Sequence, residues 1–189
     1  TGMLSAPLED KFPGQSTFNG QIVHTARYPK EGLDLQGKRV GVIGTGATGI
    51  QVIQTIAPQV DSLKVFVRTP QYVLPMSNPK YGPGEVKEYK SKYAEMADSH
   101  AHTFAGFEYD FAYVWADLSS EERWQILEEA YQHGSLKLWL GCFSEMFFDQ
   151  EVNDEVSAFV RSKMEARLGD QSLIDALVPQ EGDYGFGTH

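Results

Sequence analysis

Residues 37–51 constrain the fold of this 189-residue chain more than any other passage. An apolar run that ends at Ile43 leads into a turn in which Gly44, Gly46 and Gly49 have the spacing G-x-G-x-x-G. In such a strand–turn–helix unit the first glycine permits a tight turn and the second lets the backbone approach a pyrophosphate. The third lets the helix pack close to the strand. The passage therefore predicts a βαβ unit that binds a dinucleotide.

The flanking residues fit that interpretation. Residues 40–43 are expected to form a buried strand, and residues 50–57 a helix that ends at Pro58. A second strand is expected at residues 63–67. The predicted fold class is therefore α/β, with a Rossmann-like parallel sheet and a large helical insertion after it.

Arg68 follows the second predicted strand, nineteen residues after Gly49. A carboxylate usually occupies this place in NAD sites, where it binds the ribose. A guanidinium instead pairs with phosphate oxygens through two hydrogen bonds, so Arg68 favours the 2′-phosphate of NADP. Thr69 is expected to support Arg68 there. The alternative is a glycine turn that only packs a βαβ unit, with Arg68 solvated.

The turn also offers hydroxyl groups. Thr45 and Thr48 are expected to hydrogen-bond phosphate oxygens, while the backbone amides from Gly46 to Gly49 point at the anion. The alternative is that these side chains only satisfy neighbouring backbone groups.

Composition excludes several classes of function. A net charge of −10 without a lysine and arginine stripe argues against nucleic acid. No apolar run reaches the roughly 18 residues of a membrane span, and no signal peptide is visible. The single cysteine, Cys142, excludes an internal disulfide and is expected to be buried in a cytoplasmic protein. His100 and His102 would diverge on a helix, so no metal site is expected.

Four segments follow from these patterns. Residues 1–36 are expected to connect from a preceding domain, and residues 37–76 to form the nucleotide-binding core. Residues 77–178 are expected to form a helical subdomain, and residues 179–189 to lead back toward the nucleotide-binding core and the preceding domain.

The helical subdomain has recognisable boundaries. One helix is expected over residues 85–103, and a capping box of Ser119 and Glu122 is expected to open another that runs to about residue 133. A third is expected from Asn153 to Leu168, and a fourth over residues 170–177 with Asp170 as its cap.

Aromatic residues gather in this subdomain, where such side chains usually form core. A surface docked on another domain of the same protein and the wall of a substrate pocket are the alternatives. Residues 104–115 alternate partly, which also permits an extended segment. The cluster comprises Phe104, Phe107, Tyr109, Phe111, Tyr113, Trp115, Trp139, Phe143, Phe147 and Phe148.

Residues 18–29 resemble F-x-G-x-x-x-H-x-x-x-W-P, the fingerprint of type I Baeyer–Villiger monooxygenases. Tyr28 stands where the family usually has tryptophan. The remaining matches are residues 1–5 with Pro7, residues 12–14, the glycine turn, residues 65–70 and residues 183–188.

The resemblance implies an enzyme that uses NADPH, FAD and O₂ to insert oxygen next to a ketone carbonyl, giving an ester or lactone. It places Gln51 near the nicotinamide half of NADPH. It also implies that His24 couples the position of the nucleotide-binding part to flavin reactivity, with no catalytic residue in this chain. His189 stands where a basic residue usually contacts the 2′-phosphate. The expected cofactor-binding residues are Gly44, Thr45, Gly46, Ala47, Thr48, Gly49, Ile50, Gln51, Arg68 and Thr69.

The chain contains one glycine fingerprint, so FAD is expected to be bound mainly by a separate domain of the same polypeptide. Both ends resemble cuts through a longer protein, and the chain alone is expected to be inactive. Two other functions remain open. One is a flavin monooxygenase that oxidises amines or sulfides, which Tyr28 favours, and the other is a non-catalytic nucleotide-binding module.

Overall fold

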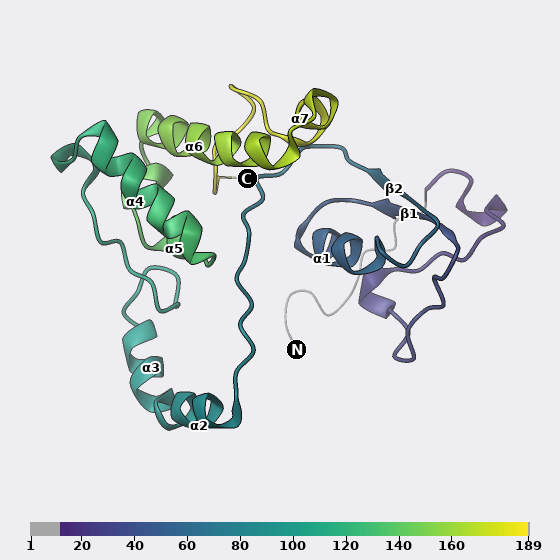
Figure 1. The fold of residues 1–189 in the computed structure, drawn as a ribbon, viewed down its shortest axis with the longest axis horizontal. Coiled ribbons are helices and arrows are strands. Elements are labelled where there is room, and N and C mark those ends of the chain that lie inside the picture. The colour runs from purple at the N-terminus through teal and green to yellow at the C-terminus, as the bar shows by residue number, and fades with distance from the viewer. Residues whose placement is uncertain (1–11, 189) are drawn as a thin grey trace. The chain divides into compact units, whose positions relative to one another are not determined.

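The structure is a computed structural model that describes residues 12–188. Its contacts divide the chain into two compact units, Thr1–Arg68 and Thr69–His189, each described separately below (Figure 1). The sequence predicted a boundary at residue 76, whereas the contacts group residues 69–76 with the helical unit. In the described part of the chain, no helix combines the length and apolar character of a membrane span.

The first unit has a β-α-β core. Strand β1 (Arg39–Ile43) is followed by helix α1 (Ala47–Ile56) and strand β2 (Ser62–Phe66). The two strands are parallel and pair in register, from Arg39 with Ser62 to Ile43 with Phe66. The predicted α/β class and parallel pairing are therefore confirmed. Two short 3₁₀ helices, η1 (Gln15–Thr17) and η2 (Thr25–Arg27), precede this core.

Two expectations for the first unit were wrong in detail. Helix α1 begins at Ala47, before the predicted residue 50, because the carbonyl of Gly46 already accepts the Ile50 amide at 3.0 Å. Strand β1 is not a buried run, since its residues alternate and Ile43 is 66% exposed. One helix and one partner strand cover only part of it, and Ile56 is the buried residue of this unit's described part.

The second unit is helical. Its elements are α2 (Pro83–Ser91), α3 (Tyr93–His100), η3 (Trp115–Asp117), α4 (Ser120–His133), α5 (Lys137–Leu140), η4 (Ser144–Phe147), α6 (Gln150–Leu168) and α7 (Gln171–Leu177).

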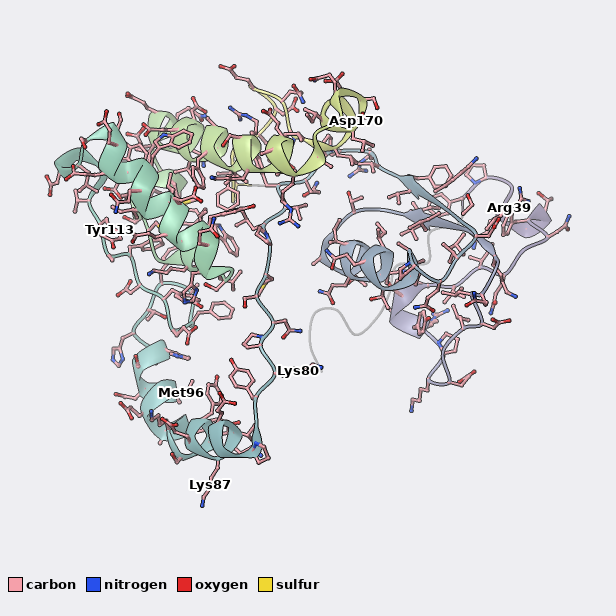
Figure 2. The ribbon with its side chains drawn as sticks, in the orientation of Figure 1. Arg39, Lys80, Lys87, Met96, Tyr113 and Asp170 are labelled. Carbon is pink, nitrogen blue, oxygen red and sulfur yellow. The ribbon has the colours of Figure 1, made fainter. Side chains whose placement is uncertain are left out.

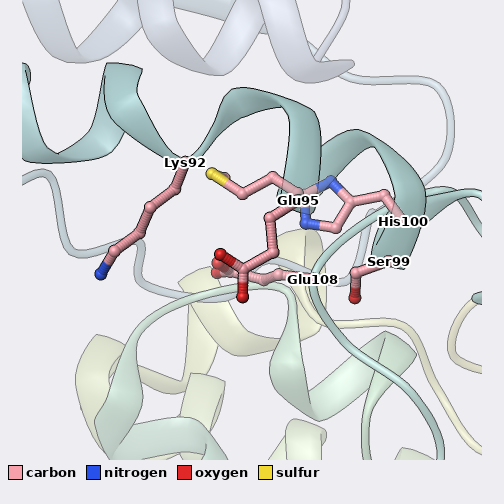
Figure 3. A pocket seen from close by; sticks show the side chains of 6 residues that line it. Lys92, Glu95, Ser99, His100 and Glu108 are labelled. Carbon is pink, nitrogen blue, oxygen red and sulfur yellow. The ribbon is translucent and has the colours of Figure 1, made fainter.

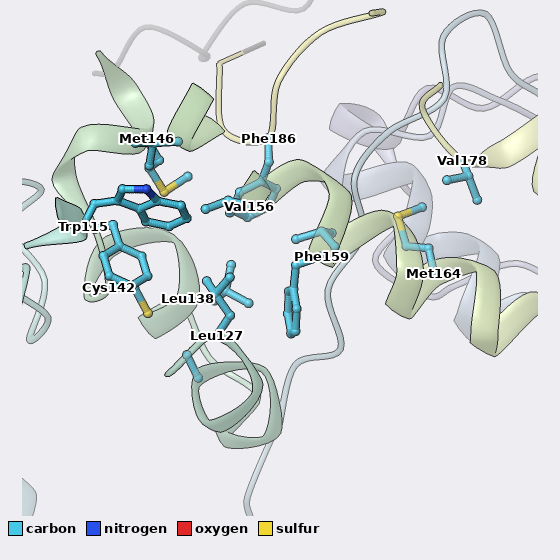
Figure 4. Close-up of a cluster of buried hydrophobic side chains, with 14 residues drawn as sticks. Trp115, Leu127, Leu138, Cys142, Met146, Val156, Phe159, Met164, Val178 and Phe186 are labelled. Atoms are coloured by element: carbon cyan, nitrogen blue, oxygen red, sulfur yellow. The ribbon is translucent and has the colours of Figure 1, made fainter. Parts of the chain in front are cut away.

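Helices α4 and α6 pack together, and α5, η4 and the chain after α7 complete the core between them (Figure 4). The core is the hydrophobic centre of this unit. It comprises Trp115, Leu127, Ala130, Leu138, Cys142, Phe143, Met146, Val152, Val156, Phe159, Val160, Met164, Val178 and Phe186.

Local signals set several helix boundaries as predicted. The Ser119 hydroxyl accepts the Glu122 amide, and the Glu122 carboxylate accepts the Ser119 amide at 2.8 Å. Hydrogen bonds from Ser119 hold the pKa of the Glu122 carboxyl below its usual range. Gly169 ends α6 with φ 65°, and Asp170 caps α7 (Figure 2).

Two helix predictions were wrong. The predicted helix over residues 85–103 is two helices, which Lys92 separates with φ −99° and ψ 4°. Helix α6 begins at Gln150 with Asp149 as its cap, so Asn153 lies inside the helix. The side chain of Asn153 is buried and bonds backbone carbonyls elsewhere in the unit.

The aromatic cluster is only partly core. Trp115 and Phe143 are buried, whereas Phe104 and Phe148 are 61% and 81% exposed. Residues 104–112 form neither helix nor strand, and Tyr113 pairs with Phe143 in an isolated parallel bridge. The segment is therefore not a helix, and it is not continuously extended either, because residues 104–108 are turns and bends and Gly106 has φ 72°.

Candidate functional site

The glycine turn connects β1 to α1 within the first unit. Gly44 has φ 97°, a left-handed conformation that disfavours residues with a Cβ. Its amide donates a hydrogen bond to the Phe66 carbonyl, 3.0 Å away, at the end of β2. The turn is thus fastened to the carboxyl end of the second strand.

The start of α1 is open. Gly46 is its N-cap residue and provides no side chain to cap the first amides. A Cβ at Gly46 would meet nothing within 4 Å. The first-turn amides of a helix have no partners within the helix, and the helix dipole favours negative charge at this end. This geometry suits the close approach of a phosphate.

Gly49 allows the helix to lie against the turn. A Cβ at Gly49 would overlap the carbonyl oxygen of Gly44, which is backbone and cannot rotate away. The expected close approach of the helix is therefore present. The helix lies against the backbone of Gly44 in the turn, whereas the sequence spacing predicted only that it would pack close to the strand.

Arg68 lies two residues after the end of β2 and is exposed. Because β1 and β2 are parallel, Arg68 follows the same edge of the sheet from which the glycine turn departs. No hydrogen bond or ion pair of its guanidinium is found among residues 12–188. Thr69, the first residue of the second unit, is half-buried.

The remaining turn residues have free polar atoms. Thr45 is half-buried, while Thr48 and Gln51 are exposed. Within the described residues, the side chains of these three residues make no hydrogen bonds. The structure therefore groups Gly44 to Gln51 and Arg68 at one edge of the sheet, and their binding roles remain predictions.

His24 has a local structural role that sequence reasoning missed. It is the N-cap residue of η2, and its Nδ1 accepts the Ala26 amide at 3.1 Å. The side chain is exposed. Histidine is not among the residues that usually cap helices, so the sequence carried no signal for this cap. Its proposed coupling role is untested by this geometry.

An open pocket lies beside α3 in the second unit (Figure 3). Glu95 and Glu108 face it together with Lys92, Ser99 and His100. Among the described residues, no group of three or more histidine, cysteine or acidic side chains is arranged to hold a metal ion. We therefore assign no catalytic or metal-binding role to this pocket.

Cys142 is fully buried in the core, as predicted. Burial raises the pKa of its thiol to about 11. The thiolate is therefore disfavoured, and the residue serves packing.

A sequence model of the flavin-binding monooxygenase-like family matches residues 3–94, which include the glycine turn and Arg68. The acetone monooxygenase (methyl acetate-forming) of Gordonia sp. (strain TY-5) is 65% identical over 188 residues, covering 100% of this chain and 35% of that protein. A Baeyer–Villiger monooxygenase of Pseudooceanicola batsensis is 35% identical over 182 residues, covering 95% of this chain and 33% of that protein. Over nearly its whole length, the chain is therefore similar to one part of the Baeyer–Villiger monooxygenases.

The fold agrees with this family. The crystal structure of OTEMO in complex with FAD and NADP superposes with a TM-score of 0.90 at 31% identity. It covers 96% of this chain and 35% of the OTEMO chain. The chain thus spans about a third of the length of the Baeyer–Villiger relatives it matches. Of the residues that carried the resemblance, residues 1–5, Pro7 and His189 lie outside the described part.

Proposed function

We propose that this chain is the NADPH-binding region, with its helical insertion, of a flavin-dependent Baeyer–Villiger monooxygenase. One observation carries the proposal: the open start of α1 and the guanidinium of Arg68 follow the same edge of the parallel sheet. A Rossmann-like nucleotide domain binds its ligand at this edge.

The residues of the turn fit a dinucleotide diphosphate. The uncapped amides of α1 can donate hydrogen bonds to a pyrophosphate, which has room to approach beside Gly46. The hydroxyls of Thr45 and Thr48 would be further donors. Arg68 is free to pair with the 2′-phosphate, and Thr69 follows it directly in the sequence. Gln51, exposed on the first turns of α1, would contact the nicotinamide half.

The chain's own role is to bind and orient the dinucleotide. When bound, NADPH supplies a hydride, and FAD with O₂ supplies the oxygen that is inserted beside a ketone carbonyl. FAD is held mainly by the rest of the polypeptide, which is also the principal protein partner. We propose a cytoplasmic enzyme, because a single cysteine, which leaves no disulfide within the chain, fits a reducing compartment.

Cofactor choice is tested in the full-length enzyme with Arg68→Ala. We expect this variant to bind NADPH more weakly by about 2–3 kcal/mol, through loss of charge-assisted hydrogen bonds, with little change for NADH. Arg39→Ala is the matched control, because Arg39 is an exposed arginine that opens β1 at the opposite edge of the sheet. Fluorescence titration at two salt concentrations gives the dissociation constants of NADPH and NADH for both variants and the parent. Equal NADPH binding by Arg68→Ala and the parent would overturn the proposed cofactor site.

Substrate class is tested by product analysis. A relative that is 65% identical is an acetone monooxygenase, so small acyclic ketones are the first class to assay, followed by cyclic ketones. Ester or lactone formation that depends on NADPH and O₂ is the expected result. A thioether addresses the second candidate, heteroatom oxidation, which Tyr28 favours. Sulfoxide formation without any ester would replace the Baeyer–Villiger assignment.

A further inference from the structure

The dipeptide Asn19-Gly20 lies in the segment that connects η1 to η2 in the first unit. Both residues are exposed, and neither belongs to a helix or a strand. Such surface segments are accessible to water and to local rearrangement. Asn19 therefore meets the first condition for spontaneous chemistry at a side-chain amide, which is access to water.

The backbone amide of Gly20 is also available. Within residues 12–188, neither this amide nor the side chain of Asn19 makes a hydrogen bond. A backbone N–H that has no acceptor inside the protein is solvated and can lose its proton to water or hydroxide. Glycine has no Cβ, so its nitrogen can approach the preceding side chain without a steric barrier.

We propose that Asn19 is a site of spontaneous deamidation through a cyclic imide. The Gly20 nitrogen loses its proton and bonds to Cγ of Asn19, and the Cγ–Nδ2 bond breaks with release of ammonia. Water then adds to either carbonyl of the five-membered ring and breaks one ring C–N bond. The products are aspartate and isoaspartate at position 19, and no electrons are gained or lost.

The consequences follow from the chemistry of the two products. Aspartate adds a negative charge at an exposed position of a chain whose net charge is already −10. Isoaspartate also routes the main chain through the side-chain carbon, which lengthens the backbone between Phe18 and Gly20. Both changes fall inside residues 18–29, the segment that resembles the family fingerprint and contains His24.

The chain provides internal controls. Asn78 is exposed but precedes Pro79, whose nitrogen carries no hydrogen and cannot attack. Asn153 is buried inside α6, where its amide bonds the Met146 and Phe186 carbonyls. The mechanism therefore predicts conversion at Asn19 and not at the other two asparagines.

The test is timed incubation of the full-length protein in mildly alkaline buffer, followed by proteolysis, mass spectrometry and enzymatic detection of isoaspartate. We expect progressive replacement of the Asn19 peptide by its aspartate and isoaspartate forms, with both control asparagines unchanged. Gly20→Ala is expected to slow conversion by at least an order of magnitude. The Phe18 ring, which is 62% exposed, can rotate away from the added methyl group.

A synthetic peptide of residues 18–29 sets the unprotected rate. Conversion of the folded protein at a rate close to that of the peptide supports the proposal. An Asn19 that stays intact in the folded protein while the peptide converts overturns it. Equal rates for Gly20→Ala and the parent would also contradict the cyclic route.

Discussion

The Tyr184 hydroxyl donates a hydrogen bond to the carbonyl oxygen of Pro70, 114 residues away in the sequence. The Tyr72 hydroxyl in turn donates to the Tyr184 carbonyl at 3.2 Å, and the two rings meet edge to face at 5.5 Å. Arg161 on α6 donates to the Tyr72 hydroxyl at 3.3 Å. These bonds fasten the segment after Arg68 and the segment after α7 to the same helix of the second unit.

Tyr184→Phe tests this connection. Burial raises the pKa of the Tyr184 hydroxyl, so it remains a donor at neutral pH. Its loss removes one hydrogen bond and leaves the Pro70 carbonyl without that donor, at a net cost of about 1 kcal/mol. In the full-length protein, we expect roughly fivefold faster hydrogen exchange in residues 69–76 and 183–188.

Tyr93→Phe is the control for that substitution, because Tyr93 is 54% exposed and lies in the same unit. Its exchange pattern is expected to match the parent. Unchanged protection of both segments in Tyr184→Phe would show that the hydrogen bond does not hold them together.

Asn153→Ala tests the buried polar network of the second unit. The Asn153 amide donates to the Met146 and Phe186 carbonyls at 2.8 and 3.0 Å and accepts the Ser157 hydroxyl at 3.0 Å. Ser157 also accepts the Phe186 amide at 2.9 Å. Removing the amide leaves buried groups unsatisfied, which costs about 1–3 kcal/mol for each.

We therefore expect Asn153→Ala to show faster amide hydrogen exchange in residues 183–188 and a lower unfolding temperature. Asn78→Ala, at an exposed position, is expected to change neither quantity. If Asn153→Ala matched Asn78→Ala in hydrogen exchange and unfolding temperature, water would be replacing the side-chain hydrogen bonds without loss of stability.

Features that depend on near neighbours were the ones that the sequence predicted. The pairing of Ser119 with Glu122 and the stop at Gly169 involve residues within one helical turn, so propensity and capping decide them. The glycine turn belongs to the same class, because φ 97° at Gly44 is a local requirement.

Features that depend on distant partners were missed. Asparagine is a common helix cap, but Asn153 lies inside α6 and its side chain donates to the distant Phe186 carbonyl, while Asp149 caps the helix. The break at Lys92 carries no glycine or proline signal. The exposure of Ile43 depends on what packs against the sheet, which β-strand patterning does not encode.

The pKa of Cys142 predicts a fall in stability at alkaline pH. The thiol has a pKa of about 11 in the folded protein, raised from 9.0 by burial, so the folded state holds this proton more tightly than the unfolded state. The contribution is fully present below pH 9 and is lost as pH rises toward 11. Its size is about 2–3 kcal/mol.

Denaturant unfolding across this pH range measures the loss. Cys142→Ala removes the titrating group, so its stability is expected to be lower at neutral pH but to fall less steeply. Thiol labelling read by peptide mass provides a second measurement, in which Cys142 of the native protein reacts only after unfolding. Rapid native labelling at neutral pH would contradict the assigned burial.

Gly49→Ala and Gly84→Ala form a pair with opposite expected signs. A Cβ at Gly49 overlaps the backbone carbonyl of Gly44, so α1 must move away from the turn, at a cost of about 1–3 kcal/mol. A Cβ at Gly84, in the first turn of α2, meets nothing within 4 Å and is expected to stabilise that helix by up to about 1 kcal/mol. NADPH affinity of the full-length enzyme should fall only in Gly49→Ala, because moving α1 displaces the amides that we propose to bind the pyrophosphate. A Gly49→Ala enzyme with parental stability and parental NADPH affinity would show that the close approach of helix and turn is not what shapes the cofactor site.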